Sequence, residues 1–158
     1  MNTMFRKIRR KDRELDRAET EQLLMKGTYG VLSINGGNGY PYGVPLSYAF
    51  TGDRIYLHCA PEGEKITRIR NDNRVAFSVV RDAVTLIDQF SVRYSSAIVF
   101  GKAYEVEGDE KFEALMLLIK KYSTEEYFEK GRTYAVNSLQ KTVVIRINID
   151  RISGKARK

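Results

Sequence analysis

The stretch from Ile55 to Val79 constrains the fold most, because it changes secondary structure twice within a short length of chain. Its sequence, IYLHCAPEGEKITRIRNDNRVAFSV, predicts a strand, a tight turn, a short basic helix and a second strand. Pro61 suits the first turn of a helix, where its missing N–H would be unpaired in any case. In the second strand, Val75 and Phe77 alternate with small residues, as in a half-buried strand. A helix is therefore expected between two strands.

The N-terminus of this expected helix has the features of a phosphate site. Glu62 and Glu64 fall in its first turn, where negative charge complements the helix dipole. Lys65 follows in the second turn, and a strand that leads into a helix N-terminus with one lysine can hold a phosphate group. His58, the only histidine of the chain, precedes the helix. The alternative interpretation of Lys65 is a solvated helix lysine without a ligand.

The first half of the chain is expected to form a helix followed by an antiparallel meander. The helix is predicted over about 17–26, with Asp16 and Glu19 as its capping box. Three strands follow, at Tyr29–Ile34, Tyr40–Phe50 and Arg54–His58. The turn Asn35–Gly39 is rich in residues that accept positive φ. Pro41 and Pro45 interrupt the second strand, which indicates an edge or a bulge whose free backbone groups can meet a ligand.

The second half is expected to contribute two long strands, Tyr94–Val106 and Lys141–Ile152, with two helices between them. The second helix is predicted over Ser123–Lys130 and is expected to end at Gly131. The segment Arg81–Val92 is expected to be a loop or an irregular strand. The first helix has an apolar face at the i, i+3, i+4, i+7 spacing, formed by Phe112, Leu115, Met116, Ile119 and Tyr122.

These elements predict a mainly β fold with six antiparallel strands and three or four helices. Only one helix lies between strands in the first half, which disfavours a doubly wound parallel sheet. A small six-stranded antiparallel barrel with flanking helices is expected instead. Residues 1–13 are expected to be a basic, flexible arm, and residues 14–158 are expected to be one domain.

The net charge of +7 would suggest nucleic-acid binding if it lay on the folded body, but it is concentrated at the two ends. Residues 1–13 and 151–158 together hold +9, which leaves about −2 for the body. A basic groove for nucleic acid is therefore not expected, and the tails are interpreted as solvated. A nucleic-acid-associated protein that uses its tails is kept as a third hypothesis for function.

Cysteine usage and hydropathy favour a cytoplasmic protein. The single cysteine, Cys59, excludes an internal disulfide and fits a reducing compartment. No run approaches the roughly 18 apolar residues of a membrane span, and no apolar segment of a secretory signal follows the basic N-terminus. One histidine and one cysteine are too few for a metal site of three or four such ligands within one chain.

Five segments that together extend over nearly the whole chain carry a family resemblance: GYPYGVPLSY (39–48), YLHCAPEGEK (56–65), RVAF (74–77), YSSAIVFGKA (94–103) and ISGKAR (152–157). Their order and spacing resemble the flavin-binding split-barrel superfamily of pyridoxamine 5′-phosphate oxidase, and within it the 5-nitroimidazole-resistance (Nim-type) branch. The resemblance implies an FMN-binding split barrel, with FAD as the alternative cofactor. It also implies a homodimer with the flavin at the subunit interface and a small-molecule substrate.

The resemblance implies roles for individual residues. The cofactor-binding set would be Val44, Pro45, Leu46, Ser47, His58, Cys59, Ala60, Glu64, Lys65, Tyr94, Ser95 and Ser96. The residues from Val44 to Ser47 would lie along the isoalloxazine ring, and those from His58 to Ala60 would line the ring and the ribityl chain. Lys65 would pair with the phosphate, and Ser95 and Ser96 would donate hydroxyl groups to phosphate or ribityl oxygens. Nim-type relatives commonly have arginine at the position of Ser95, so one charged phosphate contact is missing from the pattern.

The first hypothesis for function is a flavin-dependent oxidoreductase, in its specific form a nitroimidazole reductase that confers antibiotic resistance. His58 is the candidate catalytic residue, because its ordinary pKa of about 6.5 allows proton transfer near neutral pH. The alternative is a histidine that only hydrogen-bonds the cofactor or the backbone. Cys59 is not expected to be a nucleophile, because no second histidine is present to activate it. The second hypothesis is a non-catalytic flavin or haem binder that serves as a sensor or storage protein.

Overall fold

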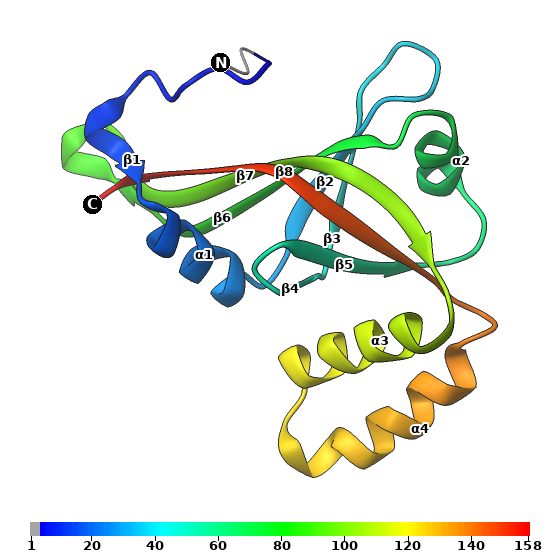
Figure 1. Ribbon diagram of the computed structural model, residues 1–158. Coiled ribbons are helices and arrows are strands. Elements are labelled where there is room, and N and C mark those ends of the chain that lie inside the picture. The colour runs from blue at the N-terminus through cyan, green and yellow to red at the C-terminus, as the bar shows by residue number, and fades with distance from the viewer. Residues whose placement is uncertain (1–3) are drawn as a thin grey trace.

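The computed structural model describes residues 4–158 and shows a curled antiparallel sheet with helices around it (Figure 1). The sheet order is β3-β2-β6-β7-β8-β5-β4, and β1 pairs with β8 outside this path. The strands are β1 (Glu14–Leu15), β2 (Gly30–Ile34), β3 (Tyr42–Leu46), β4 (Ala49–Phe50), β5 (Arg54–Cys59), β6 (Arg74–Leu86), β7 (Ser91–Val106) and β8 (Val143–Arg157). The helices are α1 (Arg17–Lys26), α2 (Glu64–Asn71), α3 (Gly108–Tyr122) and α4 (Phe128–Ser138). The curled sheet forms a half-barrel, which confirms the expected split-barrel class.

The prediction of six strands is wrong, because the expected strand Tyr40–Phe50 divides into β3 and β4 at opposite edges of the sheet. The backbone leaves the ladder at Tyr48, whose N–H donates to the hydroxyl of Tyr122 on α3 (N···O 3.0 Å). The fully buried Tyr48 side chain donates its own hydroxyl to the carbonyl of Leu24 (2.5 Å). Seven strands therefore form the continuous path, and the two-residue β1 is an eighth.

The segment 81–92, expected to be a loop or an irregular strand, forms the far half of the β6–β7 hairpin. Pairing there is irregular, because the register shifts between Arg81 and Val84 and Asp82 has a φ of 54°. At the tip of the hairpin, Ile87 and Phe90 are 83% and 97% exposed. The hairpin therefore extends past the buried part of the sheet, toward the end of the molecule that holds β1 and α1 (Figure 1).

The last helix is longer than the sequence-based prediction, which placed its end at Gly131. After a 3-10 turn at Glu125–Tyr127, α4 continues through Gly131 to Ser138. A Cβ at Gly131 would come within 2.5 Å of the side chain of Ile119 on α3. The glycine therefore permits the close approach of two helices and does not end one.

The main core is formed largely by side chains of the sheet strands, with contributions from α1 and α2. Phe77 of β6 and Tyr48 are both fully buried, and their rings meet edge to face with centroids 4.9 Å apart.

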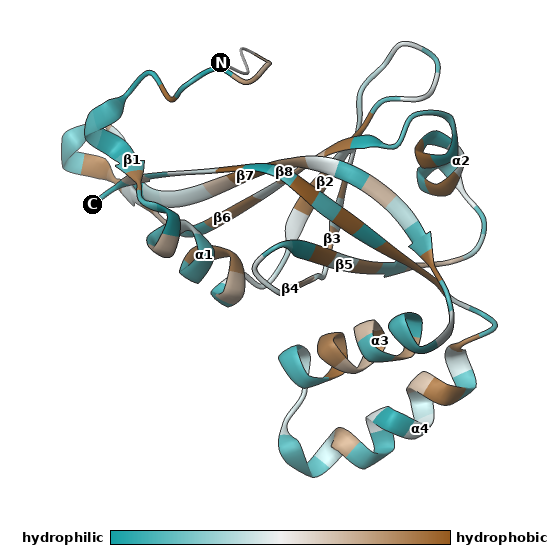
Figure 2. Cartoon of the chain, viewed as in Figure 1, coloured by the Kyte–Doolittle hydropathy of each residue, from teal (hydrophilic) through white to brown (hydrophobic). Residues whose placement is uncertain are grey.

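The predicted capping box is confirmed, because the Glu19 N–H donates to Asp16 and the Asp16 N–H donates to Glu19. A second cluster of buried side chains lies where α3 and α4 cover the sheet, and it includes Tyr56, Ala114, Leu115, Leu118 and Ala135. Figure 2 shows the strand periodicity on β8, where hydrophobic and hydrophilic residues alternate.

The described part of the expected basic arm, residues 4–13, includes a contact with the outer face of the sheet. The Phe5 ring stacks on Phe100 of β7 with centroids 5.1 Å apart. Arg151 donates to the carbonyls of Phe5 and Arg6 at 3.0 and 2.9 Å. Residues 1–3 of the arm lie outside the described residues.

Within residues 4–158, no helix combines the length and apolar character needed to cross a membrane. The same residues contain no group of three or more histidine, cysteine, aspartate or glutamate side chains placed to hold a metal ion.

Candidate functional site

Eight of the twelve sequence-predicted site residues fall in two groups at opposite ends of the β7–β8 ribbon (Figure 1), and the other four lie on or next to β3. The first group, at the end of β5 and the start of α2, consists of His58, Cys59, Ala60, Glu64 and Lys65. The second group, near the start of β7 and beside α1, consists of Tyr94, Ser95 and Ser96. The structure therefore does not bring all twelve residues to one place on one chain.

The strand register gives the separation of the two groups. His58 pairs with Val144 of β8, and Val144 pairs with Val106 of β7. Ser95 lies on the same strand as Val106, and at about 3.3 Å per residue the two positions are roughly 36 Å apart along β7. This span is much longer than an FMN molecule, so the two groups cannot share one FMN along a single chain.

Val44, Pro45 and Leu46 lie on β3, which pairs only with β2 and is therefore an edge strand. The presence of Pro45 predicted such an edge. An edge strand leaves one row of backbone N–H and C=O groups unpaired in the ladder. Val44 and Leu46 pack against the core, whereas Pro45 and the following Ser47 are exposed. The backbone of this segment is thus available to a ligand, as expected for the residues along a flavin ring.

At the end of β5, burial and, to a lesser extent, the charge of Lys65 shift the pKa values of two neighbouring side chains. Partial burial lowers the pKa of His58 below 6.5, and the positive charge of Lys65 lowers it further. Burial raises the pKa of the Cys59 thiol, and Lys65 opposes that rise. Cys59 therefore remains a protonated thiol near neutral pH and lacks the low pKa of a nucleophilic cysteine.

The N-terminus of α2 is suited to an anion. The helix begins at Glu64, so Pro61 lies before it and Lys65 falls in the first turn, one turn earlier than predicted. The N-cap residue, Gly63, has a φ of 124° and supplies no side-chain cap to the first N–H groups. Lys65 makes no ion pair within residues 4–158. Uncapped N–H groups and an unpaired ammonium together fit a phosphate.

Arg68, which the sequence analysis did not single out, anchors α2 to the glycine-rich hairpin before β3. Its guanidinium is only 5% exposed and donates to the Tyr40 carbonyl (2.6 Å) and to Glu64 (2.5 Å). A Cβ at Gly36 or Gly37 would come within 2.2 or 2.5 Å of Arg68 atoms, so both glycines are needed for this contact. The run of glycines at 36, 37 and 39 was the sequence signal for it. Arg68 therefore positions the helix that carries Lys65.

The Lys65→Ala substitution is expected to raise the pKa of His58 toward its ordinary value of about 6.5, because a nearby positive charge that disfavours the imidazolium is removed. The measurement is an NMR titration of the imidazole protons, which is unambiguous because His58 is the only histidine. The matched control is Lys120→Ala on the exposed face of α3, which should leave the His58 titration unchanged. An identical His58 pKa in both variants would show that Lys65 does not act on the imidazole.

A cavity of about 520 Å³ lies between the first group and the helices α3 and α4. We call it the tyrosine cavity, because its lining combines Ser47 and His58 with Tyr122, Tyr127 and Tyr134 and with Lys130. Tyr127 and Tyr134 are 52% and 71% exposed. These tyrosines were not predicted from the sequence to lie beside His58. Aromatic walls with a few polar groups are typical of small-molecule sites.

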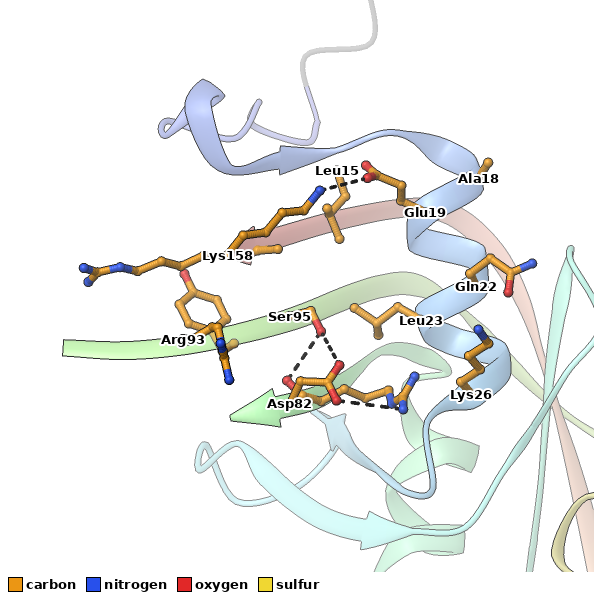
Figure 3. A pocket seen from close by; sticks show the side chains of 14 residues that line it. Leu15, Ala18, Glu19, Gln22, Leu23, Lys26, Asp82, Arg93, Ser95 and Lys158 are labelled. Carbon is orange, nitrogen blue, oxygen red and sulfur yellow. Dashed lines mark hydrogen bonds and ion pairs between the residues drawn. The ribbon is translucent and has the colours of Figure 1, made fainter. Parts of the chain in front are cut away.

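A second cavity, of about 650 Å³, lies between α1 and the strands β6, β7 and β8, and we call it the α1 cavity. Figure 3 shows Ser95 at its centre, with its hydroxyl 3.4 Å from both the Arg81 carbonyl and the Asp82 carboxylate. Tyr94 also lines it. Ser96, in contrast, has its hydroxyl near the Lys155 carbonyl (3.5 Å) and does not line this cavity.

The α1 cavity supplies positive charge that the sequence pattern lacked at position 95. Arg81 pairs with Ser95 in the β6–β7 register, and its guanidinium lines the cavity. Lys26 and Arg93 line the cavity as well. Sequence reasoning missed these residues because they come from three separated segments, and only the fold brings them around Ser95. The residues present therefore fit a phosphate group at this position despite the missing arginine.

Comparisons with known proteins agree with the family resemblance found in the sequence. The family model described as pyridoxamine 5′-phosphate oxidase matches residues 16–156. A candidate 5-nitroimidazole antibiotic resistance protein from Bacteroides thetaiotaomicron is 24% identical, with a TM-score of 0.79 over 90% of this chain and 86% of that one. An FAD-binding protein from Mesorhizobium loti is 23% identical, with a TM-score of 0.64 over 92% and 98%.

The flavocytochrome Anf3 from Azotobacter vinelandii is 18% identical, with a TM-score of 0.82 over 99% of this chain and 75% of that one. The search of curated proteins finds no match. The similarity to these solved structures, at such low identities, concerns the fold. The family model extends over most of the chain and agrees with the observed half-barrel, and the chain therefore belongs to the pyridoxamine 5′-phosphate oxidase family.

Proposed function

We propose that this protein is a flavin-dependent oxidoreductase of small molecules that holds FMN, or alternatively FAD, between two copies of the chain. The separation of the two groups of site residues carries this proposal. Lys65 and His58 lie at one end of the β7–β8 ribbon and Ser95 at the other, so one flavin meets both groups only if they come from different chains. The specific reaction proposed is reduction of a nitroimidazole to its amine, as in the Nim-type branch.

The outer face of the β6–β7 hairpin supports a second copy of the chain as the partner. Val80, Ile98 and Phe100 are 57%, 43% and 36% exposed on it. Exposed apolar side chains on neighbouring strands are costly in water and are stabilised when another surface covers them. A two-fold pairing through this face is self-complementary, which is the commonest arrangement of homodimers. Light scattering of the purified protein should therefore give the mass of two chains.

Each group of residues has a defined part in holding the flavin. Lys65 and the uncapped N-terminus of α2 bind its phosphate, and Ser95 of the second copy adds a hydroxyl contact. The edge backbone from Val44 to Ser47 binds the polar rim of the ring. The flavin supplies the electron-transfer chemistry, and the chain supplies binding, orientation and electrostatics.

The tyrosine cavity is the proposed substrate site, because it joins Ser47 and His58, both expected at the flavin ring, to an aromatic wall. A flat nitroaromatic ring can stack on tyrosine side chains there. His58 is exposed at the edge of the cavity and can deliver a proton to the reduced nitro group. Reduction to the amine consumes six electrons, so the cofactor must be reduced repeatedly by a nicotinamide donor.

The test begins with the absorbance of the purified protein and its response to added FMN and FAD. Under anaerobic conditions, a bound flavin should be reduced by NADH or NADPH and then reoxidised by a nitroimidazole in stopped-flow experiments. Protein that binds neither FMN nor FAD would refute the proposal. Flavin that binds but cannot be reduced and reoxidised within seconds to minutes would refute the enzymatic part of it.

The His58→Ala substitution is expected to lower turnover with a nitroimidazole by about a hundredfold, the typical contribution of a proton donor. The fold and the dimer mass should be retained, because the side chain is exposed and contributes little to the core. Steady-state kinetics give the turnover, and absorbance of the bound flavin gives the occupancy. A variant with full turnover would assign His58 a structural role only.

A second candidate function is a flavin or haem binder without catalysis. It is favoured by similarity to the flavocytochrome from Azotobacter vinelandii and to an FAD and haem binding protein from Mycobacterium smegmatis. A Soret band in the purified protein, or on addition of haemin, would support this candidate. Turnover of a nitroimidazole without haem would exclude it.

A further inference from the structure

The α1 cavity is larger than the phosphate end of a flavin requires. Its volume of about 650 Å³ lies within the usual range of sites for whole small molecules. A single phosphate group beside Ser95 occupies only a small part of it. The remaining space extends from Ser95 toward the C-terminal turn of α1, where Gln22 and Lys26 line it.

The acids that line the α1 cavity already have cationic partners, whereas within residues 4–158 three of its cations, Lys26, Arg93 and Arg157, do not have acidic ones. Glu19 accepts from Lys158 at 3.5 Å, and Asp82 lies 3.9 Å from Arg81. Lys26 and Arg93 make no ion pair within residues 4–158. Figure 3 shows these two residues on different elements, Lys26 on α1 and Arg93 on β7, with Ser95 and Leu23 between them. The cavity therefore has positive charge to offer to more than one phosphate.

The cavity also has an apolar wall that one phosphate would not use. Leu15 and Leu23 project into the space between the helix and the strands (Figure 3). Ala18 and Ala156 leave room beside them, and Tyr94 adds an aromatic ring to the lining. An apolar surface of this kind suits the flat face of a heterocyclic base, and a tyrosine ring can stack on it.

We propose that the α1 cavity binds the adenosine phosphate half of a dinucleotide. Arg93 and Lys26 contact its phosphates, and its adenine lies against Leu23 and Tyr94. The proposal rests on the proposed function, because it places the flavin phosphate end at Ser95, next to this space. Two dinucleotides contain the required half: FAD itself, and a nicotinamide dinucleotide that donates electrons to bound FMN.

The first test uses AMP as the probe and does not depend on flavin. Calorimetric titration of the flavin-free protein should show AMP binding that weakens as salt is raised. Arg93→Ala and Lys26→Ala should each weaken it by about tenfold or more, as expected for loss of a charge-assisted hydrogen bond. Both side chains are exposed, so the fold should be retained, and a thermal melt checks this. The matched control is Lys120→Ala, an exposed lysine on another helix.

The second test identifies the dinucleotide. If FAD is the source, the protein should bind FAD at least tenfold more tightly than FMN, and Arg93→Ala should abolish that preference. If the donor is the source, FMN and FAD should bind equally, and AMP should compete with NADH or NADPH on the FMN-loaded protein.

No AMP binding, or AMP binding unchanged in both variants, would overturn the inference. Retained FMN binding in that case leaves the proposed function intact, whereas loss of all flavin binding refutes the proposed function instead.

Discussion

Replacement of Phe77 by alanine is expected to lower the free energy of unfolding by about 3–5 kcal/mol, the largest effect of any single change considered. Phe77 lies on β6, an interior strand between β2 and β7, its side chain is fully buried, and its ring meets Tyr48 edge to face. A Cβ at Gly30 would come within 2.4 Å of the Phe77 ring, so neighbouring backbone already packs tightly against it. Truncation leaves a cavity that this rigid surrounding cannot fill.

This loss is a large part of the 5–15 kcal/mol by which a domain is typically stable. Chemical denaturation followed by circular dichroism measures it, provided that both proteins have the same denaturant dependence. Thr85→Ala, at an exposed position on the same strand, is the control and should change the free energy of unfolding by less than about 0.5 kcal/mol. A Phe77→Ala protein that is destabilised by no more than the control would contradict the core packing described above.

The Lys65→Ala substitution is expected to weaken flavin binding by about 1.5–3 kcal/mol, or roughly 10–150-fold. In the proposed site, the Lys65 ammonium makes a charge-assisted hydrogen bond to the flavin phosphate. No ion pair within residues 4–158 holds this ammonium, which leaves it available to the phosphate in the proposed site. Quenching of flavin fluorescence during titration of the flavin-free protein gives the dissociation constant.

Riboflavin, which lacks the phosphate, provides the internal comparison for this prediction. Its affinity should be the same for the native chain and for Lys65→Ala, whereas FMN affinity should fall. Lys120→Ala should alter neither value, because that exposed lysine lies on α3. Equal FMN affinity in Lys65→Ala and the native chain would remove Lys65 from the phosphate site.

Local signals in the sequence identified the elements that form from short-range interactions. The capping box at Asp16 and Glu19 defined the start of α1, and the alternation of Val75 and Phe77 defined the buried face of β6. The division of Tyr40–Phe50 was not foreseeable in this way. It depends on the Tyr122 hydroxyl, which comes from a distant helix and replaces the ladder partner of the Tyr48 N–H. Such a long-range hydrogen bond has no local sequence pattern.

The residues expected to contact flavin were named from the family resemblance, but their separation along β7 follows from strand register. Periodicity fixes the face of the sheet on which a residue lies, but it does not determine which strand pairs with which. The cations around Ser95 were missed for the same reason. Lys26, Arg81 and Arg93 are unremarkable surface charges in the sequence, and they become one cluster only when α1 packs against β7.

The hydroxyl of Tyr122 has a consequence for how the protein opens. It accepts from the Tyr48 N–H and lies within donating distance of the carbonyls of Thr28 (2.7 Å) and Tyr48 (3.0 Å). One side chain of α3 thus contacts two segments that are distant in the sequence, one before β2 and one between β3 and β4. Separation of α3 from the sheet breaks the hydrogen bond of the Tyr48 N–H. The hydrogen–deuterium exchange rate of this amide consequently measures that separation, even while the strands on either side stay paired.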